Sequence, residues 1–123
     1  MKANELRIGN LISFKGLWNG EVSEITEGVI SIKGNGGIFP HFVFEPIPLT
    51  EEWLVKLGFE FDVFYQKHSN GIICIYWLDK VCLVSWCKYH RQDLLRYKYP
   101  EYVHELQNLY FALKGEELTI KQD

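Results

Sequence analysis

The sequence predicts an α+β fold, and three patterns carry this prediction. Residues 10–48 read as a series of short strands separated by turns that contain glycine. Residues 72–86 contain two apolar runs that are typical of a hairpin. Residues 100–115 read as an amphipathic helix, with Pro100 suited to its first turn and Gly115 to the position just after it. The apolar stripe of this helix consists of Val103, Leu106, Tyr110 and Leu113.

The first strands are expected to form a curled antiparallel sheet, by analogy with SH3-like barrels. The expected strands are 10–14, 21–25, 29–33 and the extended segment 38–45. Residues 15–20 are predicted to form the first hairpin turn, with Trp18 at its tip. Asn19-Gly20 would close this turn, because both residues tolerate positive φ. Strand alternation places Ile12 and Phe14 on one face. Pro40 indicates an edge strand or an irregularity.

A short helix is predicted between Thr50 and Gly58. Thr50 is a good N-cap, and Gly58 can end the helix. Leu49 and Leu54 have the spacing of a hydrophobic staple. The preceding Pro46–Pro48 connector is too short and too apolar to be a free linker.

The second half of the chain is expected to form another antiparallel sheet. Residues 59–67 read as one strand, and 72–77 with 81–86 read as a hairpin whose two faces are both apolar. A two- or four-residue connection around Asp79-Lys80 sets a register in which one face carries Ile73, Ile75, Trp77, Cys82, Val84 and Trp86. We expect the C-terminal helix to cover one of these faces. The sequence therefore predicts a single compact domain, 1–123, with a barrel-like half (1–48) and a helix-on-sheet half (49–123).

Composition narrows the classes of protein to consider. The chain has 123 residues and a net charge of −3, which argues against a general phosphate-binding surface. Its three cysteines are an odd number, and its start lacks an apolar signal core. No run of about eighteen apolar residues is present to span a membrane. We expect a reduced, cytoplasmic protein with free thiols and no membrane partner.

Three segments together resemble a known family. They are MKANELRIGN (1–10), EPIPLTEEWL (45–54) and HELQNLYFALKGEEL (104–118). In these segments the chain is similar to a family of small proteins encoded by Bacteroidales bacteria, often in prophages and other mobile elements. The resemblance covers the whole length, although Lys114 stands where the family pattern has threonine. The family carries no established activity, so the resemblance implies an origin and a size class and assigns no site residue.

The cysteines and histidines predict no catalytic or metal site and no cofactor. His104-Glu105 resembles the start of a zinc-protease helix, but Asn108 stands where the second histidine is required. Cys87 and His90 form a C-x-x-H pair with Cys82 nearby, and a structural zinc site would need a fourth ligand. We interpret these residues as packing or surface positions.

The segment Lys88–Tyr99 is the one basic and aromatic stretch. Cations beside flat rings can follow a phosphate backbone and stack on bases, so the segment is a candidate nucleic-acid surface. The alternative is an irregular strand or loop whose tyrosines pack while its cations stay solvated. The candidate residues are Lys88, Tyr89, Arg91, Arg96, Tyr97 and Lys98, with Trp18 as a further contact. Trp18 could equally fold back on the sheet.

We expect a non-enzymatic interaction module that binds a partner protein or a second copy of itself. The first alternative is nucleic-acid binding through Lys88–Tyr99. The second is a small enzyme with a cysteine or histidine site.

Overall fold

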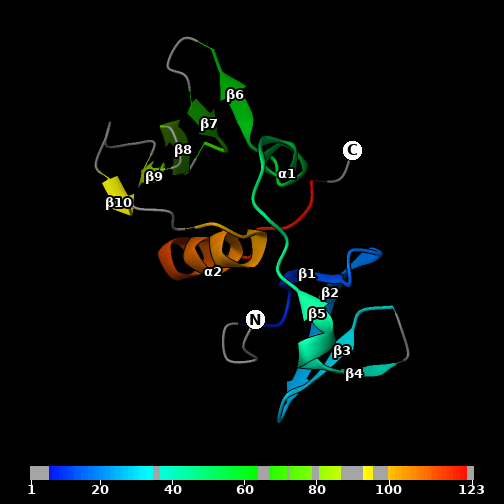
Figure 1. Cartoon of the computed structure of the whole chain (residues 1–123). Helices are drawn as coiled ribbons and strands as arrows, with labels where there is room; N and C mark the ends of the chain where they lie inside the picture. Colours follow the sequence, from blue (N-terminus) through cyan, green and yellow to red (C-terminus); the bar gives the residue numbers. More distant parts are fainter. Residues whose placement is uncertain are drawn as a thin grey trace. The chain divides into compact units, whose positions relative to one another are not determined.

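The computed structural model describes residues 6–34, 37–63, 67–71, 73–78, 81–86, 93–95 and 100–121. The chain divides into two compact units, one of residues 1–48 and 102–118 and the other of 49–101 and 119–123. Each unit contains a five-stranded antiparallel sheet, and helices accompany the strands (Figure 1). The predicted α+β class is therefore confirmed.

The first sheet follows the order β4-β3-β2-β1-β5. Its strands are β1 (Leu11–Phe14), β2 (Trp18–Thr26), β3 (Val29–Ile32), β4 (Ile38–Pro40) and β5 (Phe44–Glu45). The predicted continuous extended segment 38–45 is wrong, because a 3₁₀-helix, η2 (His41–Val43), separates β4 from β5. The register of β2 on β3 shifts between Val22 and Glu24, which marks a bulge in β2.

The turn of the first hairpin lies within the predicted segment 15–20 but is shorter, and Asn19-Gly20 does not close it. The turn lies at residues 15–17, where Lys15 and Gly16 have φ values of 49° and 74°. Gly20 instead lies inside β2 opposite Ile12. A Cβ atom at Gly20 would come within 2.7 Å of Ile32 Cγ2 and 2.9 Å of Trp18 Cζ3. Gly20 is therefore a packing glycine, whose missing side chain lets Ile32 and Trp18 approach the strand.

Aromatic side chains join the two edges of this sheet. Phe39 on β4 and Phe44 on β5 have ring centroids 5.7 Å apart, although these strands stand at opposite ends of the strand order. The same cluster includes Phe14 and Trp18, whose rings stack with centroids 5.0 Å apart. The sheet is not closed by hydrogen bonds, but it is curled, as predicted. Beneath the aromatic cluster lies an aliphatic core of Leu6, Ile12, Val22, Ile30 and Ile32.

The C-terminal helix, α2 (Val103–Lys114), begins later than Pro100 suggested. Its N-cap is Tyr102, and the Glu105 side chain accepts a hydrogen bond from the Tyr102 amide over 3.1 Å. Extended pairing precedes the helix, since Tyr102 forms a β-bridge with Pro48 and the Val103 amide donates to Ile47 O over 2.8 Å. Gly115 ends the helix with a φ of 75°, as the sequence predicted.

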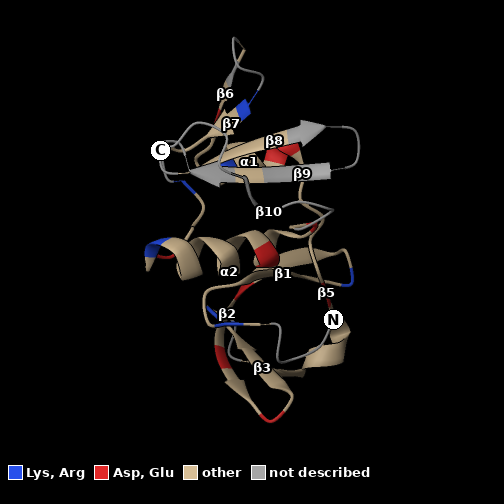
Figure 2. Ribbon diagram, turned by 90° about the vertical axis from the view of Figure 1, so that its left-hand side faces the viewer, with Lys and Arg blue, Asp and Glu red and all other residues tan. Residues whose placement is uncertain are grey.

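α2 lies beside β1 of the first sheet (Figure 2), and buried polar side chains attach it there. Gln107 is only 1% exposed. Its Oε1 accepts from the Leu11 amide over 2.8 Å, and its Nε2 donates to Gly9 O over 3.1 Å and Leu118 O over 3.0 Å. This carboxamide thus uses one acceptor and two donors to bind backbone groups of two segments, residues 9–11 and Leu118.

A second set of contacts lies beside Gln107. Asn10 Nδ2 donates to Asn108 Oδ1 over 2.9 Å, and Asn10 Oδ1 accepts from the Arg7 amide over 2.6 Å. Arg7 pairs with Glu117 over 2.5 Å, and its guanidinium carbon lies 3.9 Å from the centroid of the Phe111 ring. Side chains of the segment before β1 are therefore connected to α2 and to the segment that follows it.

This arrangement divides the chain differently from the predicted halves 1–48 and 49–123. Residues 102–118, which were expected to cover the second sheet, belong to the first unit. The hydrophobic stripe of α2 indicated a buried face but not which sheet buries it. The hydrogen bonds of Gln107 and Asn108 to residues 9–11 make that choice, and apolar spacing does not reveal them.

The second unit contains the short helix α1 (Glu51–Lys56) and a sheet of order β10-β9-β8-β7-β6. Thr50 caps α1, since its Oγ1 accepts from the Trp53 amide over 3.3 Å. The predicted single strand 59–67 is wrong, because two antiparallel strands, β6 and β7, occupy this region. The strands are β6 (Glu60–Asp62), β7 (Lys67–Ser69), β8 (Ile73–Leu78), β9 (Val81–Trp86) and β10 (Asp93–Leu95).

The β8–β9 hairpin has the predicted register. Ile75 pairs with Val84 and Leu78 with Val81, which leaves a two-residue connection. Ile73, Cys74 and Ile75 are all buried, so both faces of β8 are covered at this point.

Replacing Gln107 with alanine should destabilise the protein by about 3 kcal/mol, because the buried Leu11 amide and Leu118 carbonyl lose their partner. The free energy of unfolding from urea denaturation measures this change. Lys114→Ala is the control, because this exposed position on the same helix should change stability by less than about 0.5 kcal/mol. Equal stability of the two variants would refute the role given to Gln107.

Gly20→Ala should cost about 1–3 kcal/mol, since the added methyl group must displace Ile32 and Trp18. The neighbouring exposed Asn19→Ala is the matched substitution, with an expected change within about 0.5 kcal/mol. Thermal unfolding of both variants tests the difference. A Gly20→Ala protein as stable as the Asn19→Ala protein would contradict the packing argument.

Candidate functional site

Trp18 contributes to the core of the first unit. Its ring stacks on Phe14 with an interplanar angle of 12° and meets Phe39 and Phe44 edge-on. It lies in β2 and not at the tip of the hairpin, where the sequence had placed it. Of its two predicted roles, the structure bears out packing against the sheet.

The other candidate nucleic-acid contacts lie outside the described residues. These are Lys88, Tyr89, Arg91, Arg96, Tyr97 and Lys98. Nucleic-acid binding through this segment therefore stays a prediction.

Among the described side chains are those of Cys74 and of three histidines, His41, His68 and His104. Cys74 is buried, and His41 Nδ1 lies 3.0 Å from Gly28 O. His68 and His104 are buried in different units. Cys87 and His90 lie outside the described residues. Among the residues that are described, no three His, Cys, Asp or Glu side chains are grouped to hold a metal ion.

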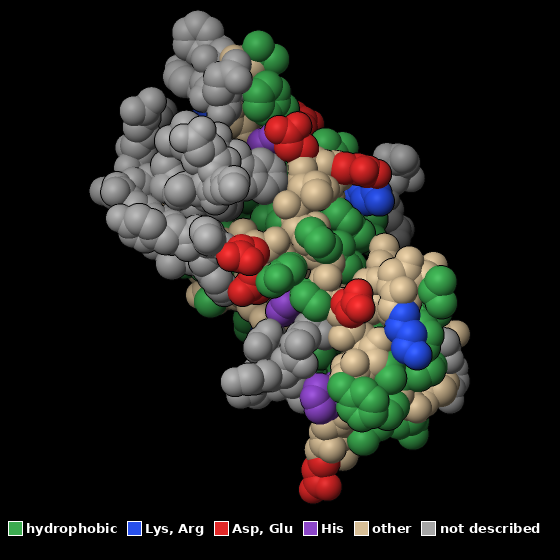
Figure 3. Space-filling view, in the orientation of Figure 1, with side chains coloured by type: hydrophobic (Ala, Val, Ile, Leu, Met, Phe, Trp, Pro, Cys, Tyr) green, Lys and Arg blue, Asp and Glu red, His purple; other side chains and the backbone are tan. Residues whose placement is uncertain are grey.

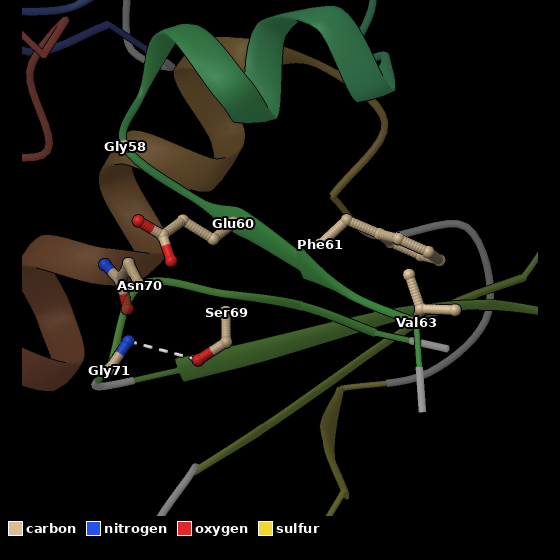
Figure 4. A pocket seen from close by; sticks show the side chains of 7 residues that line it. All are labelled: Gly58, Glu60, Phe61, Val63, Ser69, Asn70 and Gly71. Atoms are coloured by element: carbon tan, nitrogen blue, oxygen red, sulfur yellow. Dashed lines mark hydrogen bonds between the residues drawn. The ribbon is translucent and has the colours of Figure 1, made fainter. Parts of the chain in front are cut away.

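A surface hollow of the second unit lies beside β6 and has a volume of about 750 Å³. It is lined by Gly58, Glu60, Phe61, Val63, Ser69, Asn70 and Gly71 (Figure 4). A second hollow of about 320 Å³ shares Gly58 and Glu60 with it and is lined also by Val55, Lys56, Phe59, Ile120 and Lys121. We call these two adjoining hollows, with the residues just named, the β6 groove.

Exposed hydrophobic side chains of the second unit concentrate in the β6 groove. Four large ones are exposed among its described residues, by 44–72%, and all four line the groove. They are Val55, Phe61, Val63 and Ile120. Over β6, hydrophobic side chains lie at the surface beside acidic ones (Figure 3). Apolar side chains gathered around a hollow are typical of an interaction site, whereas single scattered ones are not.

Local structure shapes the wall of the groove next to α1. Gly58, with a φ of 93°, turns the chain out of the helix, and the buried Phe59 anchors the start of β6. The Lys121 amide donates to Lys56 O over 2.7 Å, which holds the C-terminal segment against the end of α1. Ile120 is thereby placed beside Val55 on the rim of the smaller hollow.

The turn after β7 forms the opposite wall. The Gly71 amide donates to Ser69 Oγ over 3.1 Å, and the Ile73 amide donates to Asn70 Oδ1 over 3.0 Å. Figure 4 shows Glu60 and Asn70 near Gly58, with Phe61 and Val63 at the other end of the strand. The Ser69 hydroxyl is thus used in the turn, and the groove combines fixed polar groups with apolar walls. This combination suits binding.

Sequence reasoning identified residues 59–67 as extended but not as a site. The signal was present in the alternation Glu60-Phe61-Asp62-Val63, which places apolar residues two apart between acids. The sequence does not say that Phe61 and Val63 remain exposed.

No protein-family model, curated protein or solved structure matches the chain. Neither helix in the described part of the chain has the length and apolar character needed to cross a bilayer.

Proposed function

We propose that the protein is a non-enzymatic interaction module that binds a partner protein through the β6 groove. The observation that carries this proposal is the concentration of exposed hydrophobic side chains of the second unit along the two adjoining hollows. Such a surface gains free energy when a partner removes it from water, at about 25 cal/mol per Å². The walls are held by backbone hydrogen bonds, so little ordering is needed on binding.

We further propose that the first unit is an SH3-like curled sheet, not closed into a barrel, that serves as the scaffold of the module. Two observations support this: the strand order β4-β3-β2-β1-β5, and a 3₁₀-helix between β4 and β5. A cytoplasmic location and an origin in Bacteroidales mobile elements remain predictions from the sequence.

Peptides selected from a random display library on the full-length chain should bind through the groove. Val63→Lys should weaken them by about tenfold or more, because it places a charge on the apolar wall. Leu17→Lys is the matched control, since Leu17 in the first unit is 76% exposed and Val63 is 72% exposed. Fluorescence polarisation measures both affinities.

Both substitutions are at exposed positions, so unfolding free energies should stay within about 0.5 kcal/mol of the parent protein. Failure to select any binder, or equal loss of binding in both variants, would contradict the proposed function.

A further inference from the structure

We infer that the partner enters the β6 groove as an extended, cationic and apolar polypeptide segment that adds a strand to the free edge of β6. This inference rests on the proposed function and names the chemistry of the partner.

The backbone of β6 is available on one side. β6 is the last strand in the order of the described second sheet, and β7 pairs with only one of its edges. Its other edge presents N–H and C=O groups that can pair with an incoming strand. The larger hollow is lined by Glu60 and Phe61 of β6 and by Ser69, Asn70 and Gly71 at the end of β7, and the smaller hollow is lined by Phe59 and Glu60 at the start of β6.

The other three edges of the two described sheets are short or irregular. β4 ends in Pro40, which has no N–H, and β5 has only two residues. The pairing of β10 shifts register between Asp93 and Leu95. β6 contains no proline, and no register shift marks its pairing with β7. β6 is therefore the described edge best suited to accept a strand.

The acids of β6 select the charge of the incoming strand. Its sequence is Glu60-Phe61-Asp62. If two copies of β6 paired antiparallel about Phe61, Glu60 of each copy would stand opposite Asp62 of the other, and like charges in these positions repel. A second copy of the chain is thus disfavoured, and a strand with cations at alternate positions is favoured.

The partner that β6 already has, β7, shows which side chains pair with this sequence. Lys67 pairs in register with Asp62, and His68 pairs with Phe61. The ring centroids of Phe61 and His68 lie 4.9 Å apart. A cation opposite an acid and a flat or apolar side chain opposite Phe61 is the pattern that we expect on the free edge as well. Phe61 and Val63 are two residues apart, so they can receive alternate side chains of the added strand.

The test uses a fluorescein-labelled nine-residue peptide that alternates lysine and valine, with blocked ends, on the full-length protein. We expect binding that weakens with added salt. A glutamate–valine peptide should bind about tenfold more weakly or worse, as should a lysine–valine peptide N-methylated at alternate residues, which lacks the backbone donors on one edge. Glu60→Lys should reduce the preference for the lysine peptide, whereas the exposed Glu27→Lys of the first unit should not.

Equal binding of the lysine and glutamate peptides, or no effect of N-methylation, would refute the inference that a cationic strand is added to β6. If library-selected peptides still lose affinity in the Val63→Lys variant, the proposed function would remain supported. A dimer seen by light scattering and lost in Val63→Lys would overturn the inference in favour of a second copy of the chain.

Discussion

The side-chain amide of Gln107 determines how the first unit is assembled. It satisfies the Leu11 amide at the start of β1, the Gly9 carbonyl before it and the Leu118 carbonyl after α2. Each of these groups would otherwise need another partner at a buried site. Because Gln107 stands on α2, the helix can occupy only the position in which these three bonds form. The Arg7–Glu117 pair and the Asn10–Asn108 bond lie beside Gln107 and also connect the segment before β1 to α2 and the segment after it.

With α2 fixed in this way, the first unit uses its aromatic residues to complete a core. Phe39 and Phe44 come from opposite edges of the sheet, and their contact with Phe14 and Trp18 replaces the backbone pairing that would close a barrel. Gly20 permits this contact by leaving room for Trp18 and Ile32. The aromatic residues Phe14, Trp18, Phe39 and Phe44 are thus used for packing within the first unit.

The sheet of the second unit differs from the first in where its side chains are buried and where they are exposed. Its central hairpin is buried on both faces at Ile73–Ile75, whereas β6, the last strand in the described sheet, carries the exposed side chains of Glu60 and Phe61. An edge of this kind can bind extended chains, and the acidic residues limit which chains pair with it. The contact surface is proposed in this unit because its exposed hydrophobic side chains gather around the hollows beside β6.

Features that depend on neighbouring residues could be read from the sequence alone. The α+β class, the Thr50 cap, the Gly115 helix end and the register of the β8–β9 hairpin all follow from local spacing and backbone preference. Long-range contacts decided the rest. Asn19-Gly20 has a strong turn preference, but cross-strand packing outweighed it. The stripe of α2 did not specify its sheet, because that choice depends on buried amides whose partners are about one hundred residues away in sequence. The exposure of Phe61 and Val63 likewise depends on which elements cover β6, and only the tertiary structure settles that.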